Sequence, residues 1–255
     1  MALAPHAEPF HSDGVVDASG RRIGVLLSHG FTGSPASIVP WGKYLAAQGY
    51  AVSVPLLPGH GTTWEEMNGT TFEDWYAALE AEFEKLRAST DAVVVGGLSM
   101  GACLAIQLAA RHPQDVAGLV LVNPAVASTN KQLLAVPFLK YVVKGMPAIG
   151  DDIKRAGVTE HAYPKTPLKA LHTMVRAWKQ VREELPKVTA PVLLFRSAED
   201  HVVDPSSARI ILGTVSSRDV TETVLQNSYH VATLDNDAPQ IFEESADFVR
   251  RTTAS

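Results

Sequence analysis

Short apolar runs alternate with longer amphipathic stretches along most of this chain of 255 residues. The runs are nearly continuously apolar, as strands covered on both faces of a parallel sheet are. They lie at Ile23–Ser28, Tyr50–Val54, Ala92–Leu98, Val116–Val122, Pro191–Arg196 and Val220–Leu225. Helical patterns fall between them, at Pro35–Gln48, Phe72–Ala88, Met100–Arg111, Pro205–Leu212 and Ala238–Arg250. The alternation predicts an α/β fold with a mainly parallel, doubly wound sheet, whose functional loops follow the carboxyl ends of the strands.

One interval, between Val122 and Pro191, is much longer than a crossover helix requires. Its first part, Lys131–Ile149, is apolar with scattered lysines, and its second part, Thr159–Leu185, is more polar with helical character. We predict that residues 126–187 form a cap inserted over the carboxyl edge of the sheet. Residues 1–125 and 188–255 then form the core, and a separate small domain is the alternative interpretation.

The sequence Gly97-Leu98-Ser99-Met100-Gly101 joins a predicted strand to a predicted helix. In this context G-x-S-x-G forms a nucleophile elbow, a tight and strained turn with the serine at its apex. Glycines two positions before and after the serine let the strand and the helix approach closely. The helix N-terminus places a backbone N–H and the positive end of the helix dipole near a reacting carbonyl. We therefore predict that Ser99 is a nucleophile.

A second signal lies upstream, where Val25-Leu26-Leu27 runs into Ser28-His29-Gly30-Phe31. A strand that ends in His-Gly supplies the second backbone donor beside such an elbow, from the residue after the glycine. The backbone N–H groups of Phe31 and Met100 are therefore predicted to form an oxyanion hole. His29 is expected to be structural, because it precedes the nucleophile, whereas the base of this arrangement follows it.

The base is predicted to be His230, which follows the last predicted strand in the loop Asn227-Ser228-Tyr229-His230-Val231. The expected order along the chain is nucleophile, acid and then histidine. His201 also follows the elbow, but it is adjacent in sequence to the candidate acids. A histidine in the same turn as the acid cannot easily be reached by it across the site.

The acid is predicted to be Asp200, with Glu199 as the alternative, because both follow the strand Pro191–Arg196. Apolar residues after Asp200 can anchor its turn. Asp204 is expected instead to be the N-cap of a helix with Pro205 at its first position.

These residue types predict nucleophilic acyl transfer. His230 takes the proton of Ser99, while Asp200 orients the imidazole and stabilises its charged form. The serine attacks an acyl carbonyl, and water then cleaves the acyl-enzyme. This chemistry needs no metal and no organic cofactor. Cys103, on the helix behind the elbow, is expected to be a packed small residue.

Further motifs extend the pattern over almost the whole chain. The sequence resembles bacterial carboxylesterases and monoacylglycerol lipases of the α/β-hydrolase superfamily, from about Gly24 to Phe248. Ser28 and Ala102 depart from the valine and glycine of that pattern without touching the chemistry. The matching segments are His29–Ser34, Gly59–Thr62, Gly97–Gly101, Glu199–Val203 and Ser228–Asp235.

The resemblance implies the α/β-hydrolase fold and hydrolysis of carboxylic esters, most simply of monoacylglycerols or short- to medium-chain acyl esters. The segment Val158–Tyr163 also resembles the cap of monoacylglycerol lipases, in which a glutamate lies near the glycerol end of the substrate. Carried over, that residue is Glu160, and Ile149 lines the pocket. The alternative is that Glu160 is a solvated helix residue.

The apolar first half of the predicted cap is a candidate acyl-chain site and a candidate for transient contact with a lipid surface. The alternative is that its side chains pack the cap onto the sheet. The apolar side chains concerned are Leu133, Leu134, Val136, Phe138, Leu139, Val142 and Val143.

Other reactions on the same triad are those of a thioesterase, a carbon–carbon hydrolase or an acyltransferase. A non-catalytic ligand-binding protein is a further alternative.

Composition excludes several other classes of protein. The formal net charge is −5 and no long run of one sign occurs, which argues against a nucleic-acid partner. A single cysteine excludes an intramolecular disulfide and a cysteine-based zinc site. No basic region leads into an apolar core in the first 25 residues, as a signal peptide would require, so a cytoplasmic location is expected.

Overall fold

The computed structural model describes residues 3–148 and 150–254. A seven-stranded sheet in the order β1-β3-β2-β4-β5-β8-β9 forms its centre. All neighbouring strands are parallel except β1, which pairs antiparallel with β3. The strands are β1 (Phe10–Ser12), β2 (Ile23–Ser28), β3 (Ala51–Val54), β4 (Ala92–Leu98), β5 (Val116–Val122), β8 (Val192–Ser197) and β9 (Val220–Leu225).

Alternate side chains of the central strands enter two apolar cores, one on each face of the sheet. In β4, Val93 and Val95 join one core, whereas Val94 and Leu98 join the other. This period of two explains why a strand covered on both faces is apolar at nearly every position. The central strands therefore form the rigid support from which the site loops project.

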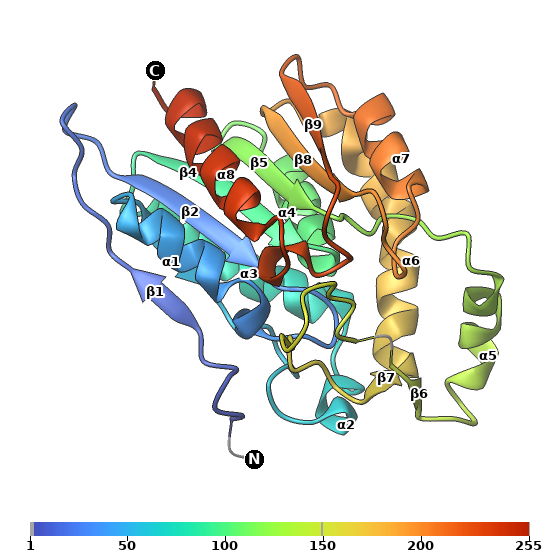
Figure 1. The fold of residues 1–255 in the computed structure, drawn as a ribbon. Coiled ribbons are helices and arrows are strands. Elements are labelled where there is room, and N and C mark those ends of the chain that lie inside the picture. The colour runs from blue at the N-terminus through green and yellow to red at the C-terminus, as the bar shows by residue number, and fades with distance from the viewer. Residues whose placement is uncertain (1–2, 149, 255) are drawn as a thin grey trace.

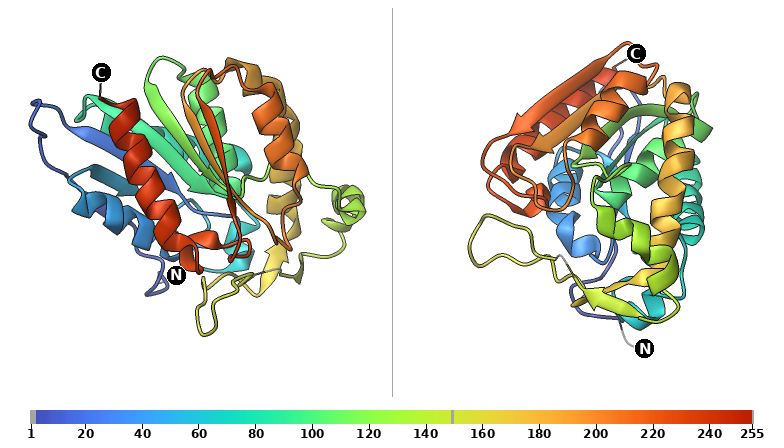
Figure 2. Two further views of the ribbon diagram at one scale, coloured as in Figure 1. Left: turned by 45° about the horizontal axis from the view of Figure 1, so that its top comes forward. Right: turned by 90° about the vertical axis from the view of Figure 1, so that its right-hand side faces the viewer.

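Helices cover both faces of the sheet (Figures 1 and 2). One face carries α1 and α8, which contact each other, and the other carries α3, α4 and α6. The last helix of the layer, α7, packs beside the end of α6 through the short helix η3. Their bounds are α1 (Val39–Ala47), α3 (Phe72–Arg87), α4 (Met100–Arg111), α6 (Leu168–Glu184), η3 (Leu185–Lys187), α7 (Ser206–Thr214) and α8 (Ala238–Thr252).

Local sequence explains where α3 begins and why α4 can be buried along its length. At the start of α3, Thr71 and Asp74 form a capping box, in which the Thr71 hydroxyl accepts from the Asp74 N–H at 3.2 Å and the Asp74 carboxylate accepts from the Thr71 N–H at 2.8 Å. In α4, every residue from Met100 to Ala110 is buried. Small and apolar residues suit this helix because it packs against the sheet, α3 and α6.

The long interval between β5 and β8 contains irregular chain, short elements and the crossover helix α6. Its two short strands pair with each other antiparallel. The segment with α5 projects away from the sheet, on the side of α6 (Figure 1). Because α6 also packs against α3 and α4, part of the predicted cap lies in the helical layer of the core. The short elements are η2 (Lys131–Ala135), α5 (Val136–Leu139), β6 (Gly145–Pro147) and β7 (Lys165–Pro167).

The predicted α/β fold and parallel sheet are confirmed, with local differences. The expected helix Pro35–Gln48 is a 3₁₀ turn, η1 (Pro35–Ser37), followed by α1. The polar segment from Thr159 is helical only from Leu168. The strand β9 is not covered on both faces, because it is the edge strand and its first three residues are exposed. Sequence periodicity missed β1, the β6–β7 ribbon and the short helices α2 (Trp64–Met67) and η4 (Ala232–Leu234). These elements are too short to show a periodic pattern.

Candidate active site

Ser99 occupies the sharp turn between β4 and α4. Its backbone has φ 56° and ψ −113°, a conformation that residues with a side chain rarely adopt. The turn is held by a hydrogen bond from the Ser99 N–H to the carbonyl of Val122, at 2.9 Å. The strain presents the hydroxyl at the top of the sheet, between the ends of β2 and β5. This is the geometry of the predicted nucleophile elbow.

The two glycines of the elbow are required by close backbone contacts. A Cβ on Gly97 would lie 2.4 Å from the carbonyl carbon of Gly101. A Cβ on Gly101 would lie 2.0 Å from the carbonyl oxygen of Ser28, at the end of β2. Helix α4 therefore begins in direct contact with the strand that leads to Phe31.

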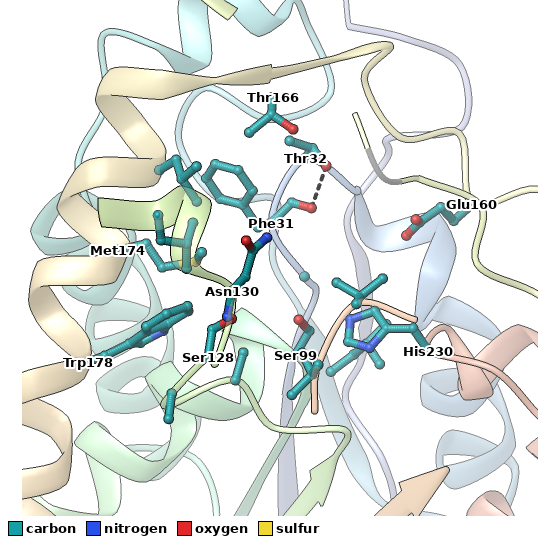
Figure 3. Close-up of a pocket in the computed structure, with 18 residues that line it drawn as sticks. Phe31, Thr32, Ser99, Ser128, Asn130, Glu160, Thr166, Met174, Trp178 and His230 are labelled. Atoms are coloured by element: carbon teal, nitrogen blue, oxygen red, sulfur yellow. Dashed lines mark hydrogen bonds between the residues drawn. The ribbon is translucent and has the colours of Figure 1, made fainter. Parts of the chain in front are cut away.

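The structure brings His230 and Asp200 together beside Ser99. His230 Nδ1 lies 2.8 Å from Asp200 Oδ2, and both side chains are almost fully buried. The other Asp200 oxygen accepts from the N–H groups of Val202 and Val203, each at 2.8 Å. The backbone N–H groups of Val202 and Val203 therefore hold the Asp200 carboxylate in place. Ser99 and His230 line the same pocket (Figure 3).

Burial and charge act in opposite directions on this pair. Burial alone would lower the pKa of His230, but the Asp200 carboxylate, with Glu160 and Asp152, raises it above the usual value. Burial alone would raise the pKa of Asp200, but His230 and the Val203 and Val202 N–H groups lower it. The acid is therefore ionised at neutral pH, and the imidazole is suited to accept and hold a proton.

Glu199 and His201, the sequence neighbours of Asp200, point elsewhere. The Glu199 side chain is 54% exposed and pairs with Lys154 at 3.5 Å. His201 is about half exposed, and its Nδ1 lies 2.7 Å from Asp152 Oδ1. The geometry therefore favours Asp200 over Glu199 as the partner of His230.

Asp204 and Pro205 differ by one position from the predicted cap. The helix α7 begins at Ser206, with Pro205 at the N-cap rather than at the first helical position. Asp204 still receives the Ser206 N–H at 2.9 Å, so it satisfies a free donor at the helix start. Its second oxygen accepts from the Thr129 N–H at 2.9 Å, which attaches the start of the insert to α7.

His29 is a structural residue, as predicted. It is completely buried, its Nδ1 lies 3.0 Å from the carbonyl of Gly30, and its Nε2 accepts from the Leu57 N–H at 3.2 Å. Burial lowers the pKa of His29 to about 4, so the ring is neutral at neutral pH. The loop that carries Phe31 is thereby fixed beside the elbow. Phe31 lines the same pocket as Ser99, and Met100 is the first residue of α4; the oxyanion hole formed by their N–H groups stays a prediction.

A pocket of about 950 Å³, including its open mouth, surrounds Ser99. Figure 3 shows Met174 and Trp178 on the side formed by α6, Glu160 and His230 on the opposite side, and Ser99 between them. The side formed by α6 therefore carries apolar side chains, with the polar Ser128 and Asn130 beside them, and the opposite side carries ionisable groups. The apolar residues that line the pocket as a whole are Phe31, Leu98, Ala125, Ala127, Leu133, Leu171, Met174, Trp178, Val202 and Val203.

The expected acyl-chain site in the first half of the insert is wrong for most of its residues. Of the seven apolar side chains named for it, Leu133 alone is among those that line the pocket, in the part of the chain that the structure describes. Leu134, Phe138 and Val142 are 77%, 77% and 83% exposed. The wall comes instead from α6, whose Leu171, Met174 and Trp178 recur every three to four residues. That helical spacing was present in the sequence.

Glu160 is buried at the rim of the pocket and lies in a loop, so it is not a solvated helix residue. Its Oε1 accepts from the Asp151 N–H at 3.1 Å, and its own N–H donates to Asp151 Oδ1 at 2.6 Å. Burial raises the pKa of Glu160, while the Asp151 N–H and His230 partly offset this effect. Ile149 lies outside the described residues.

Asp235 fixes the loop of His230 to the insert. The side chain is fully buried, and its Oδ2 accepts from the N–H groups of Lys154 at 2.6 Å and Tyr229 at 2.9 Å. Its Oδ1 accepts from Arg155 at 2.9 Å and Asn236 at 2.8 Å. One carboxylate therefore serves the backbone of two segments that are far apart in sequence.

Within residues 3–148 and 150–254, no group of three or more His, Cys, Asp or Glu residues is arranged to hold a metal ion. In the same ranges, no helix is both long enough and apolar enough to cross a bilayer.

Comparisons with known proteins show the family of this chain. The chain matches the Hydrolase_4 family, described as serine aminopeptidase, S33, over residues 20–237. It is 41% identical to a thermostable monoacylglycerol lipase of Bacillus sp. (strain H-257), over 95% of this chain and 94% of that protein. It is 26% identical to a carboxylesterase of Bacillus subtilis (strain 168), over 89% of this chain and 92% of that protein.

Solved structures show the same fold. A structure reported with the metagenome-derived lipolytic enzymes LipS and LipT is 40% identical, with a TM-score of 0.93 over 98% of this chain and 100% of that chain. A soluble variant of monoglyceride lipase from Saccharomyces cerevisiae has a TM-score of 0.82 at 17% identity, over 97% of this chain and 92% of that chain.

The fold and the site together define an α/β-hydrolase of the lipase and esterase class. The chain belongs to the Hydrolase_4 family.

Proposed function

We propose that this ester hydrolase cleaves monoacylglycerols and simple short- to medium-chain esters. The observation that carries the proposal is the division of the pocket around Ser99, with an apolar wall from α6 on one side and Glu160 on the other. A monoacylglycerol has the same division, with an acyl chain on one side of its ester bond and a small polar head on the other. Similarity to the monoacylglycerol lipase of Bacillus sp. supports this choice.

In the proposed reaction, His230 removes the proton from the Ser99 hydroxyl as the oxygen attacks the ester carbonyl. Asp200 holds the imidazole through Nδ1, at 2.8 Å, and stabilises its positive charge. The N–H groups of Phe31 and Met100 stabilise the oxyanion of the tetrahedral intermediate. His230 then protonates the leaving alcohol, and water activated by the same imidazole releases the fatty acid from Ser99.

Residues 126–187 act as the cap of this proposed enzyme. The acyl chain packs against Leu171, Met174 and Trp178, and Glu160 accepts hydrogen bonds from the glycerol hydroxyls, directly or through a water molecule. Contact between Glu160 and the Asp151 backbone holds the carboxylate at the rim. The pocket is proposed to accommodate one acyl chain, so long-chain triacylglycerols are expected to be poor substrates.

Two substrates with the same acyl chain test this proposal, a monoacylglycerol and a nitrophenyl ester. Glu160→Ala is expected to lower kcat/KM for the monoacylglycerol about tenfold or more, because unpaired hydroxyls cost about 1–3 kcal/mol and 1.4 kcal/mol is about a factor of ten. The nitrophenyl ester has no glycerol hydroxyls and is expected to be hydrolysed at nearly the wild-type rate. Equal losses on both substrates, or no loss on either, would contradict glycerol recognition. Ready cleavage of long-chain triacylglycerols would contradict the preference for monoacylglycerols.

The same cap is proposed to contact a lipid surface that contains the substrate. Leu134, Phe138, Tyr141 and Val142 are each at least 77% exposed around α5, where an isolated monomer rarely gathers so many large apolar side chains. The segment 126–150 contains three lysines and no acidic residue, although the whole chain has a net charge of −5. This combination of apolar and basic side chains suits an anionic bilayer.

Vesicle sedimentation tests this contact. Phe138→Ser/Val142→Ser is expected to reduce co-sedimentation with phosphatidylglycerol vesicles and hydrolysis of vesicle-borne monoacylglycerol, while hydrolysis of a soluble nitrophenyl ester is retained. The matched control is Val15→Ser/Val16→Ser, because these valines are 62% and 54% exposed before β2, away from α5 (Figure 1). Equal binding by the wild type and both double variants would contradict the proposal.

A further inference from the structure

Asp152 is a largely but not fully buried carboxylate of the insert that contacts the loops of both His230 and Asp200. Its side chain is only 12% exposed. Oδ2 accepts from the His230 N–H at 3.1 Å and from the His201 N–H at 3.2 Å. Oδ1 lies 2.7 Å from His201 Nδ1, and the Asp152 carbonyl accepts from the Val231 N–H at 3.1 Å. One residue of the insert is therefore bonded to two separate loops of the core.

These two loops carry the acid and the base of the proposed triad. His201 directly follows Asp200, and the loop begins where β8 ends. His230 lies in the loop after β9. The two side chains must meet at 2.8 Å, although they come from different strands. The Asp152 carboxylate joins the backbones of the two loops on the side of the insert.

We infer that Asp152 is a positioning residue, which sets the spacing between the Asp200 loop and the His230 loop and adds negative charge beside the imidazole. The inference rests on the proposed triad. It also gives the insert a part in catalysis that is distinct from covering the substrate. The chemistry itself remains with Ser99, His230 and Asp200.

The charges around His230 determine how activity depends on pH. Three carboxylates raise the pKa of the imidazole: Asp200 from the β8 loop, and Glu160 and Asp152 from the insert. Next to Asp152 lie His201, whose pKa that carboxylate raises, and the half-exposed pair of Glu199 with Lys154. Removing the charge of Asp152 therefore makes protonated His230 less favourable. The activity of such a variant should persist to lower pH, because the neutral imidazole is the form that accepts the proton of Ser99.

Two substitutions separate the charge of Asp152 from its positioning effect. Asp152→Asn keeps one oxygen that can accept from the His201 and His230 N–H groups, but removes the charge. Asp152→Ala removes both. Glu199→Gln is the matched control, because it removes a carboxylate from the same loop as Asp200 without removing these acceptors. Thermal unfolding of each variant shows whether it is folded at the assay temperature.

Kinetics on a soluble nitrophenyl ester, from pH 5 to 9, test the inference. Asp152→Ala is expected to lower kcat roughly ten- to a hundredfold with a smaller change in KM, since misplacement by about 1 Å costs up to about a hundredfold. Asp152→Asn is expected to recover much of that loss and to move the acidic midpoint of kcat/KM down by roughly half a pH unit. Glu199→Gln should match the wild type.

Several outcomes would overturn the inference. Folded Asp152→Ala protein with wild-type kcat would exclude positioning. An unchanged acidic midpoint in Asp152→Asn would exclude the charge effect, and equal loss in Asp152→Asn and Asp152→Ala would show no rescue by the retained oxygen. The proposed function fails separately, when the wild type does not hydrolyse the ester or when Ser99→Ala does so at a similar rate.

Discussion

Gly101 lies directly against Ser28: a Cβ on the glycine would stand 2.0 Å from the serine carbonyl oxygen and 2.6 Å from that of His29. Because the close atoms belong to the backbone, no change of side-chain rotamer can relieve this contact. Gly101→Ala is therefore expected to push α4 away from β2 and to lower the free energy of unfolding by about 1–3 kcal/mol or more. Denaturant titration measures this change, and activity should fall as well because the elbow is displaced.

Ser28→Ala is the control for that substitution, because it leaves the backbone carbonyl in place. The Ser28 hydroxyl is buried and has no hydrogen-bond partner in the part of the chain that the structure describes. Its removal should leave the unfolding free energy within about 1 kcal/mol of the wild type. A loss as large as that of Gly101→Ala would show that the packing at Ser28, rather than its carbonyl, limits the contact.

Ser99→Ala should abolish ester hydrolysis while the protein remains folded. Loss of a triad member costs on the order of 10⁶ in kcat, and the remaining catalysis comes from the oxyanion hole and from binding. The variant should also fail to react with a fluorophosphonate probe, which labels an activated serine. Retention of more than a few per cent of wild-type activity on short esters would mean that another residue is the nucleophile.

His230→Ala and His201→Ala should differ sharply, although both residues contact the Asp152 carboxylate. His230 is paired with Asp200 inside the pocket, so its loss should lower kcat by at least about 10⁴. His201 is half-exposed, and its alanine variant keeps the backbone N–H that donates a hydrogen bond to Asp152. Its kcat should therefore fall only slightly. Steady-state kinetics on one nitrophenyl ester compare them. A severe His201→Ala defect beside a mild His230→Ala defect would reverse the assignment.

Activity should fall at acidic pH because protonated His230 cannot accept the proton of Ser99. Burial alone would lower the pKa of this imidazole, but Asp200, Glu160 and Asp152 together raise it. The midpoint of the acidic limb of kcat/KM should therefore lie above about 6.5, the ordinary histidine value. Assays in overlapping buffers from pH 5 to 9 measure the midpoint. A profile that stays flat over this range would argue against a histidine base.

Much of the site could be predicted from sequence because its residues lie at fixed places along the chain. The motif around Ser99 needs a strand before it and a helix after it, and both can be recognised by periodicity. His230 could be distinguished from His201 because it follows the last strand, whereas His201 is adjacent in sequence to the candidate acids. Asp200 could be preferred to Glu199 because Val202 and Val203 follow it, and their N–H groups do bind its carboxylate.

The structure of the insert could not be predicted in the same way. The sequence does not distinguish which apolar residues of the insert face the pocket. Phe138 is exposed, whereas Trp178 lines the pocket. Their different positions depend on how α6 packs against α3 and α4, which no local pattern encodes. The contact of Asp152 with His230 joins residues 78 positions apart, and short polar loops give no periodic signal for such a contact.

The buried Asp235 carboxylate has a consequence for recombining members of this family. Two of its four donors belong to the insert, at Lys154 and Arg155, and the other two belong to the core. A chimera that joins this core to a foreign insert must reproduce those two N–H groups, or it leaves a buried charge short of partners beside the His230 loop. Crossover points that keep residues 152–155 with the core should therefore give more folded, active proteins than exchange of the whole insert.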